Sequence, residues 1–432
     1  MKTQIEGISI KDVARLTSPV GWILLARPVI YFIFTRRRDL DSYSSVDMSA
    51  MIFILYAFVA FWMACIDIFR SESGFGRAVT SRSPILWFLI YSVFGVVSMA
   101  WSVNPPLTGF RAFECVATAL LIVAVVQDLF DRGSLKFVMT WSLLYCVWDT
   151  IWSLIRMGQW APDLATLLQA SQMMSTCFFF IAFYFIPRRW YNWLVMVMSI
   201  FSMSTVAYIG MILGCISGFW TNVKGKLMTG VIAFIILLGV IAIGPYRIIK
   251  NTIFFDKNDV SLEETSGRNL LMNATLESLD ENPMGLGFFA AEPYVLYSKG
   301  LQAISAHNSL FSAAMGMGIP GAIIFAVFLL ALFRCVFSRH IPREYRAMLI
   351  GCFCVAFMHC MGNPSVGTRV FGAWMPCMYI FVLVCGFYVF GKYYELKNHS
   401  SDEVGCQNIS DESTYSEEYK HHENNLGNKK LS

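Results

Sequence analysis

Charged residues are scarce in this sequence. Only 14% of its 432 residues are Asp, Glu, Lys or Arg, whereas about a quarter are charged in an ordinary soluble domain. Hydrophobic residues make up 56% of the chain, and its mean hydropathy is +0.56. The net charge of +4 is small, and the basic residues are scattered, which excludes nucleic acid as a partner. The composition therefore predicts a polytopic membrane protein.

The sequence also lacks a cysteine framework. Its twelve cysteines lie in or beside apolar runs, apart from Cys406 in the polar tail, and none lies between residues 245 and 309. Cys352 and Cys354 have no neighbouring ligands at zinc spacing. We therefore expect neither a disulfide-bonded loop nor a metal site, and no cofactor.

Apolar runs long enough to cross a bilayer recur along the chain, since about twenty apolar residues are needed. They predict an all-α fold with about twelve transmembrane helices within a membrane domain over residues 1–397. The expected spans are 20–34, 46–69, 84–100, 112–130, 137–155, 168–186, 190–206, 209–222, 227–244, 310–333, 345–361 and 371–391.

The basic residues alternate between the predicted connections. One side receives Arg70, Arg77, Arg82, Arg132, Lys136, Arg188, Arg189, Lys224, Lys226, Arg334, Arg339, Arg343 and Arg346. The positive-inside rule makes that side cytoplasmic. The other side receives Arg111, Arg156, Arg369 and the long polar segment 245–309. We therefore expect a bacterial inner (cytoplasmic) membrane protein with one long periplasmic loop.

The two ends of the chain differ from the predicted membrane spans between them. The run 20–34 contains Arg27 and Pro28, and the basic cluster 36–38 that follows it would face outward if the run spans. A true span and an interfacial or re-entrant segment both remain open. No small-residue cleavage site follows the run, so we expect it in the mature protein. Residues 398–432 are polar and lack apolar periodicity, which predicts a disordered cytoplasmic tail.

Two polar stretches contain motifs. The first, residues 101–111, reads Trp-Ser-Val-Asn-Pro-Pro and ends at Arg111. The second begins at Gly267-Arg268-Asn269, continues through Asn-Pro-Met-Gly-Leu-Gly-Phe at 282–288, and reaches His307-Asn308. The simpler interpretation is an interfacial tryptophan with a snorkelling arginine, a solvated Arg268, and a histidine that caps the next helix together with Asn308.

Together these stretches resemble the O-antigen ligase/polymerase superfamily, which includes exopolysaccharide polymerases, O-antigen polymerases and the ligases that attach O-antigen to lipid A-core. The resemblance covers roughly residues 84–391 in topology, and its specific motifs are 101–111 and 267–321. It implies a GT-C-like, metal-independent membrane glycosyltransferase that acts on undecaprenyl-diphosphate-linked oligosaccharide at the periplasmic face. It also suggests a chain-length regulator protein as a partner.

The resemblance assigns roles to single residues. Arg268 matches the loop arginine, whose planar fork suits a diphosphate, and His307 matches the loop-end histidine, a residue type suited to general base catalysis near neutral pH. These two are the catalytic candidates. The substrate-binding candidates are Arg111, Arg369, Glu263 and Asn308. One departure is the stretch 204–210, where relatives commonly carry a second arginine and this chain has none.

The sequence is also compatible in part with other functions. The loop contains several acidic residues, Glu292 among them, but no pair is held at the separation that a two-carboxylate glycosidase needs. A polysaccharide polymerase is the first hypothesis, and a ligase that transfers glycan to lipid A-core is the second. A lipid-linked oligosaccharide transporter is the third, although transporters place ionisable residues in their spans and this chain has few there: Asp67, Glu114 and Asp149.

Overall fold

The structure is a computed structural model, and it describes residues 18–34, 47–70, 83–132, 268–301, 306–341, 343–362 and 379–389, with short pieces between 138 and 155, between 209 and 217, and at 391–392. Within these ranges the regular elements are helices, and no strand occurs. The all-α prediction is confirmed for this part of the chain. The expected spans 168–186, 190–206 and 227–244 and the tail 398–432 lie outside it.

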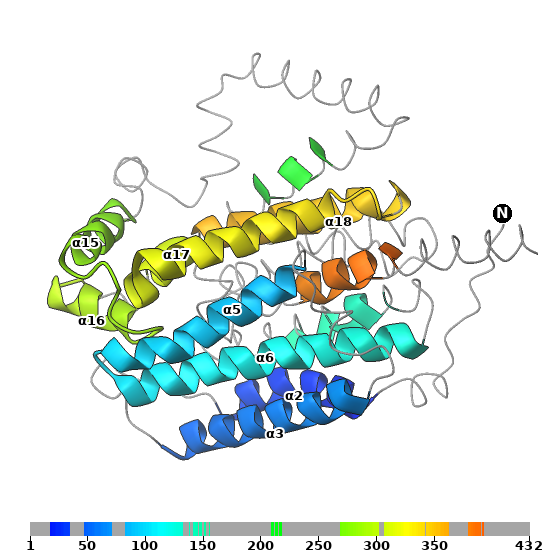
Figure 1. The fold of residues 1–432 in the computed structure, drawn as a ribbon, viewed down its shortest axis with the longest axis horizontal. Helices are drawn as coiled ribbons and strands as arrows, with labels where there is room; N and C mark the ends of the chain where they lie inside the picture. The colour runs from blue at the N-terminus through cyan, green and yellow to red at the C-terminus, as the bar shows by residue number, and fades with distance from the viewer. Residues whose placement is uncertain are drawn as a thin grey trace, which may run out of the picture.

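The described helices follow the apolar runs closely (Figure 1). They are α2 (Pro19–Phe34), α3 (Met48–Arg70), α5 (Pro84–Val97) with the 3-10 turn η2 (Ser98–Trp101), α6 (Pro105–Arg132), α15 (Arg268–Glu281), α16 (Ala291–Ser298), α17 (Ser309–Val336) and α18 (Arg343–Gly362). A further apolar helix covers Tyr379–Val389.

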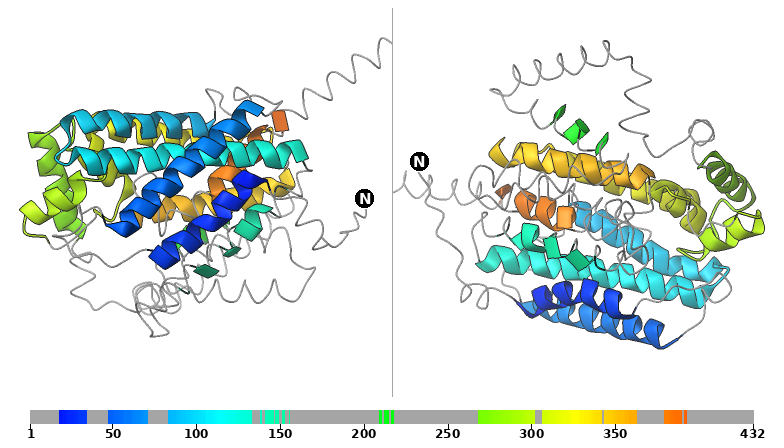
Figure 2. Two further views of the ribbon diagram at one scale, coloured as in Figure 1. Left: turned by 90° about the horizontal axis from the view of Figure 1, so that it is seen from below. Right: turned by 180° about the vertical axis from the view of Figure 1, so that it is seen from behind.

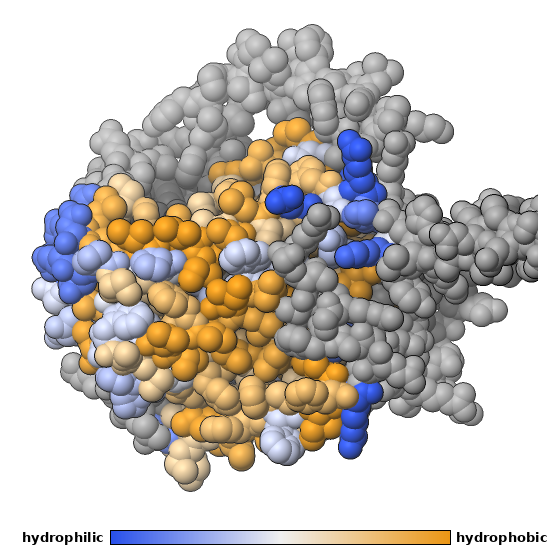
Figure 3. Space-filling model, viewed as in Figure 1, coloured by the Kyte–Doolittle hydropathy of each residue, from blue (hydrophilic) through white to orange (hydrophobic). Residues whose placement is uncertain are grey.

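Four of these helical segments are long and apolar enough to cross a membrane: α3, α5 with η2, α6 up to Leu129, and α17. Shorter apolar helices cover Pro19–Phe34, Tyr345–Met361 and Tyr379–Val389. In Figure 3 apolar side chains form a broad band across the visible face, and hydrophilic side chains gather at its two ends. These features describe a multi-pass membrane protein, whereas the predicted total of about twelve spans extends beyond the described residues.

The long helices lie side by side (Figures 1 and 2), with α3, α6 and α17 running in one direction and α5 in the other. Helix α6 packs against both α3 and α5, and α5 packs against α17. The short helices α15 and α16 lie at the end of the bundle where α17 begins, while α3, α6 and α17 all finish at the opposite end. The last turn of α3 contains Arg70, and the last turn of α17 contains Arg334. These basic residues therefore lie at the end of the bundle away from α15 and α16, as the alternation of basic residues predicts.

Helix α2 belongs to the bundle. It packs against α3 and α6, and the ring of its Tyr31 stacks on Phe53 of α3 with centroids 4.5 Å apart. Pro28 lies inside the helix, and the side chain of Arg27 is only 1% exposed. A segment lying flat at the interface would not bury Arg27 in this way, so the structure favours a bundle helix over the interfacial alternative.

The start of α6 differs from the prediction. The helix begins at Pro105, seven residues before the expected residue 112. Asn104 is responsible, because its side-chain oxygen accepts from the Leu107 N–H at 3.2 Å and the following proline suits the first position of a helix. Arg111 therefore lies inside α6, in its second turn, instead of preceding the helix.

Candidate active site

Residues 282–290, called the glycine turn below, are hydrogen-bonded to the backbone of α17. The N–H groups of Leu286 and Gly287 donate to the carbonyls of Met315 (3.0 Å) and Gly316 (2.8 Å). In return the Ile319 N–H donates to the carbonyl of Pro283 at 3.0 Å. Three backbone hydrogen bonds thus join a turn to the interior of a membrane-spanning helix.

A kink in α17 makes these bonds available. Gly318 has the non-helical angles φ 67° and ψ −163°, and Pro320 follows. The proline has no N–H to give to the Gly316 carbonyl, and the Gly318 conformation turns the Ile319 N–H away from Met315. The polar groups released by the kink are the ones that the glycine turn satisfies.

The other side of the glycine turn contacts the joint between α5 and α6. The Trp101 indole N–H donates to the Met284 carbonyl at 2.9 Å, across 183 residues of sequence. Phe288 donates from its N–H to Ser98 Oγ at 3.0 Å, and its carbonyl accepts from Thr108 Oγ1 at 3.0 Å. The two motif stretches of the sequence, 101–111 and 267–321, therefore meet in one joint.

Two glycines are required by this close approach. Gly287 has φ +104°, and a Cβ there would lie 2.0 Å from Ser102 Oγ. Gly285 has φ +75°, and a Cβ there would lie 2.4 Å from the backbone nitrogen of Gly318. Non-glycine residues rarely adopt such angles, so both positions need glycine for conformation and for space.

The second part of the glycine turn, residues 285–290, is largely buried, whereas Pro283 and Met284 are exposed. Phe288 and Phe289 are 2% and 5% exposed, and the Phe288 ring meets Tyr91 of α5 edge-on at 6.0 Å between centroids. Both rings belong to the core of the bundle. Tyr294 and Tyr297 of α16 are exposed.

Arg111 lies next to this joint. Its guanidinium carbon is 4.9 Å from the centre of the Phe289 ring and 5.0 Å from that of Phe110, distances typical of cation–π contacts. Its Nη1 donates to Glu114 Oε2 at 2.9 Å. The side chain stays 15% exposed, so a ligand at this end of the bundle can reach it.

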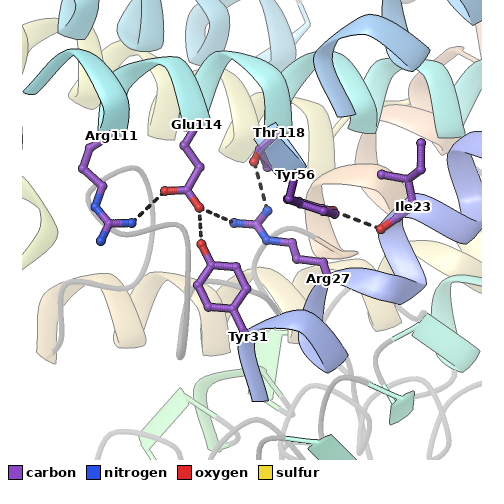
Figure 4. Close-up of polar contacts among 7 residues, drawn as sticks. All are labelled: Ile23, Arg27, Tyr31, Tyr56, Arg111, Glu114 and Thr118. Carbon is purple, nitrogen blue, oxygen red and sulfur yellow. Dashed lines mark hydrogen bonds and ion pairs between the residues drawn. The ribbon is translucent and has the colours of Figure 1, made fainter. Parts of the chain in front are cut away.

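Glu114 connects Arg111 to α2 (Figure 4). Its other oxygen, Oε1, accepts from the Tyr31 hydroxyl and lies 3.8 Å from Nη2 of Arg27. Arg27 also donates to Thr118 Oγ1 at 2.9 Å. The sequence marked Glu114 as one of few charges within spans, but no local pattern indicated that Arg27 is its partner.

His307 lies in the turn that leads into α17. It is exposed, and its φ of +52° is unusual for a residue other than glycine. Asn308 is the N-cap of α17, where its Oδ1 accepts from the Leu310 and Phe311 N–H groups and its Nδ2 donates to the Met361 carbonyl at 3.3 Å. The capping interpretation is therefore confirmed for Asn308, and its substrate-binding role stays a prediction.

A buried carboxylate is hydrogen-bonded to both sides of the turn that contains His307. Glu292, in the first turn of α16, is 2% exposed. Its Oε1 accepts from the Ala306 N–H at 3.2 Å and from the Ser312 hydroxyl. The sequence grouped Glu292 with the other acidic residues of the loop, but the structure gives it a specific place, because it accepts from the N–H of Ala306, the residue before His307.

The remaining candidates are less fully described. Arg268 is the first residue of α15, and its side chain, like Glu263 and Arg369, lies outside the described residues. Lys299 binds Glu277 at 2.9 Å and thereby joins the end of α16 to α15. The hydrogen bond and charge of Glu277 raise the pKa of Lys299. No group of metal-binding side chains occurs in the part of the chain that the structure covers, and the cysteines described there are free.

A comparison with protein families finds a match over part of the chain. Residues 190–326 match the family model described as O-antigen ligase. The matched range contains α15, the glycine turn, α16 and the first part of α17 including its kink, but not residues 101–111. No curated protein matches the chain.

Proposed function

We propose that the chain is a polysaccharide polymerase of the O-antigen ligase/polymerase superfamily, because its residues 190–326 match the O-antigen ligase family model. In this proposal it transfers undecaprenyl-diphosphate-linked glycan repeat units at the periplasmic face of the bacterial inner membrane, in exopolysaccharide or O-antigen biosynthesis. The donor and acceptor are both carried by lipids, and a chain-length regulator protein is a proposed partner.

The observation that carries the proposal is the joint between the two motif stretches. The glycine turn joins α17 to the residues before α6, and the starts of α6 and α17 lie with the helices α15 and α16 at one end of the bundle (Figure 1). Arg111 is in the second turn of α6, and His307 directly precedes the N-cap of α17. Arginines and a histidine at the membrane surface suit a reaction between a lipid diphosphate and a sugar hydroxyl.

The proposed chemistry is a substitution at the anomeric carbon. The acceptor hydroxyl oxygen forms the new glycosidic bond, while the bond from that carbon to the diphosphate breaks and its electron pair leaves with the diphosphate. His307 accepts the hydroxyl proton. Arg268 and Arg111 stabilise the negative charge that develops on the departing diphosphate, so the proposal needs no metal ion.

Two alternatives share parts of this account. A ligase would use the same donor and pass the glycan to lipid A-core. A transporter would move the lipid-linked glycan without making a bond, and the buried cluster of Arg27 and Glu114 is the kind of feature that transporters also contain. The family match favours an enzyme over a transporter.

Reconstitution separates the three functions. The purified protein is placed in liposomes with the labelled lipid-linked repeat unit, isolated from cells that lack this chain, and the products are separated by electrophoresis. A polymerase yields a ladder of glycans from this substrate alone, and a ligase yields a single product only after lipid A-core is added. If no glycosidic bond forms with either acceptor, the enzymatic proposal is wrong. Liposomes without protein are the control.

A further inference from the structure

We propose that Glu114 is a positioning residue that orients Arg111 toward an anionic lipid diphosphate, and that Arg27 and Tyr31 of α2 hold Glu114 in place. This inference rests on the proposed function, because it takes Arg111 as a residue that binds the donor. In this proposal a buried cluster between α2 and α6 determines the orientation of the Arg111 guanidinium.

The two carboxylate oxygens of Glu114 have separate partners. Oε2 accepts from Arg111 at 2.9 Å, whereas Oε1 accepts from the Tyr31 hydroxyl and faces Arg27. Figure 4 shows the three side chains converging on this carboxylate from α2 and α6. Glu114 therefore bridges the two helices instead of pairing only with its neighbour one turn away.

Burial distinguishes the members of the cluster. Arg27 and Glu114 are 1% and 2% exposed, but Arg111 is 15% exposed. Among these three ionised side chains, Arg111 is the one that a ligand can approach without opening the bundle. In this proposal the buried members act on a bound diphosphate through Arg111.

The charges explain why a carboxylate can orient an arginine that must attract an anion. A lone glutamate beside Arg111 would neutralise it, and the pair would have little attraction for a diphosphate. Arg27 supplies a second positive charge on the far side of the carboxylate, so that Glu114 can hold Arg111 while its own charge is offset. The rings of Phe110 and Phe289 beside the guanidinium fix its plane further.

Binding of undecaprenyl diphosphate tests this inference independently of turnover. Its Kd is measured in detergent for the wild type, Arg111→Ala, Glu114→Asp and the double variant, with uncharged undecaprenol as the comparison ligand. Glu114→Asp keeps the charge but shortens the side chain by one methylene, so that it can no longer bridge both helices. The control Ser49→Ala removes the hydrogen bond from Ser49 Oγ to the Phe34 carbonyl, which also joins α3 to α2 but involves no member of the cluster.

We expect Arg111→Ala and Glu114→Asp each to weaken diphosphate binding about tenfold, the scale of one charge-assisted hydrogen bond. Neither should change undecaprenol binding, and Ser49→Ala should change the binding of neither ligand. In the Arg111→Ala background, Glu114→Asp should add less than about twofold, because the two residues act as a unit.

Three outcomes would overturn the inference. Glu114→Asp could weaken binding equally in both backgrounds, which means that it acts independently of Arg111. It could weaken undecaprenol binding as much as diphosphate binding, which means that its role is structural. Arg111→Ala could leave diphosphate binding unchanged, which means that Arg111 is not part of the donor site. The proposed transfer reaction is tested separately by the ladder of glycans.

A second variant covers the case in which Glu114→Asp does not assemble. The double substitution Arg27→Met with Glu114→Met removes the buried pair together and leaves no unpaired buried charge, a change that proteins often tolerate. It should weaken diphosphate binding to the same extent as Glu114→Asp. Wild-type affinity in this variant contradicts the positioning role.

Discussion

The backbone N–H of Gly287 donates to the carbonyl of Gly316 at 2.8 Å, which joins a turn between two short helices to the kink of a membrane-spanning helix. The Gly316 carbonyl is available because the residue four positions later, Pro320, has no N–H. The bond therefore depends on sequence features in both segments. A change at either glycine should disturb the whole end of the bundle that contains Arg111 and His307.

Gly287→Ala should strongly destabilise the protein. The new Cβ would lie 2.0 Å from Ser102 Oγ, and the position has φ +104°. We expect a lower melting temperature in detergent and less protein in the membrane fraction. Gly300→Ala is the matched control, because Gly300 has φ +74° but nothing within 4 Å of a Cβ, so it should cost only the conformational strain of about 1–2 kcal/mol. Equal losses for the two variants would show that packing against Ser102 is unimportant.

The two ends of the bundle should face opposite sides of the membrane. Cysteines introduced at the exposed positions Tyr297 and Arg339, in a background whose native cysteines are replaced, can be tested with a membrane-impermeant thiol reagent. We expect labelling at 297 in intact cells and labelling at 339 only after permeabilisation, because basic residues remain on the cytoplasmic side. The reverse pattern would put the candidate site on the wrong side of the membrane.

Arg268→Lys should reduce glycan polymerisation strongly although the charge is kept. A single ammonium group cannot reproduce the two parallel hydrogen bonds that a guanidinium makes to a diphosphate. The length of cell-surface glycan is compared between variant and wild type at equal expression. Lys299→Arg is the control, since this residue binds the carboxylate of Glu277 near the same end. Normal glycan length with Lys at position 268 rules out the phosphate-binding role.

Glu292→Gln tests how the His307 turn is held. The carboxylate accepts from the Ala306 N–H and the Ser312 hydroxyl, and an amide is a weaker acceptor than a carboxylate. We expect lower transferase activity with a stability loss of about 1–3 kcal/mol. Ser312→Ala, which removes one partner and leaves the Ala306 bond, should have the smaller effect. If Glu292→Gln leaves activity unchanged, the turn does not depend on this carboxylate.

The sequence predicts the described spans well because membrane crossing demands long apolar runs. Its bounds for α3, α17 and α18 are within three residues of the observed ones: 46–69, 310–333 and 345–361 against Met48–Arg70, Ser309–Val336 and Arg343–Gly362. The expected start of α6 at residue 112 was wrong because the span was placed by its apolar residues, which begin after Asn104-Pro105-Pro106 and Arg111. Asn104-Pro105 is an N-cap followed by proline, which is a signal for the first turn of a helix.

The candidate site is predictable only in part. The motifs identify which segments matter, and the structure explains that Trp101 and the glycine turn belong to one joint. The cluster of Arg27 and Glu114 is different, since its members come from separate helices and no local periodicity relates them. Long-range pairing of this kind depends on how the helices pack, which composition and spacing do not determine.

The most direct test of the account is His307→Ala, examined by electrophoresis of cell-surface glycan beside an immunoblot of the membrane fraction. His307 is exposed, so its truncation opens no core cavity and the protein should remain in the membrane. Loss of a general base should lower the rate by about 10²–10⁴. We predict a normal protein level, no long glycan and accumulation of single lipid-linked repeat units. Long glycan at a normal protein level would contradict the catalytic role of His307.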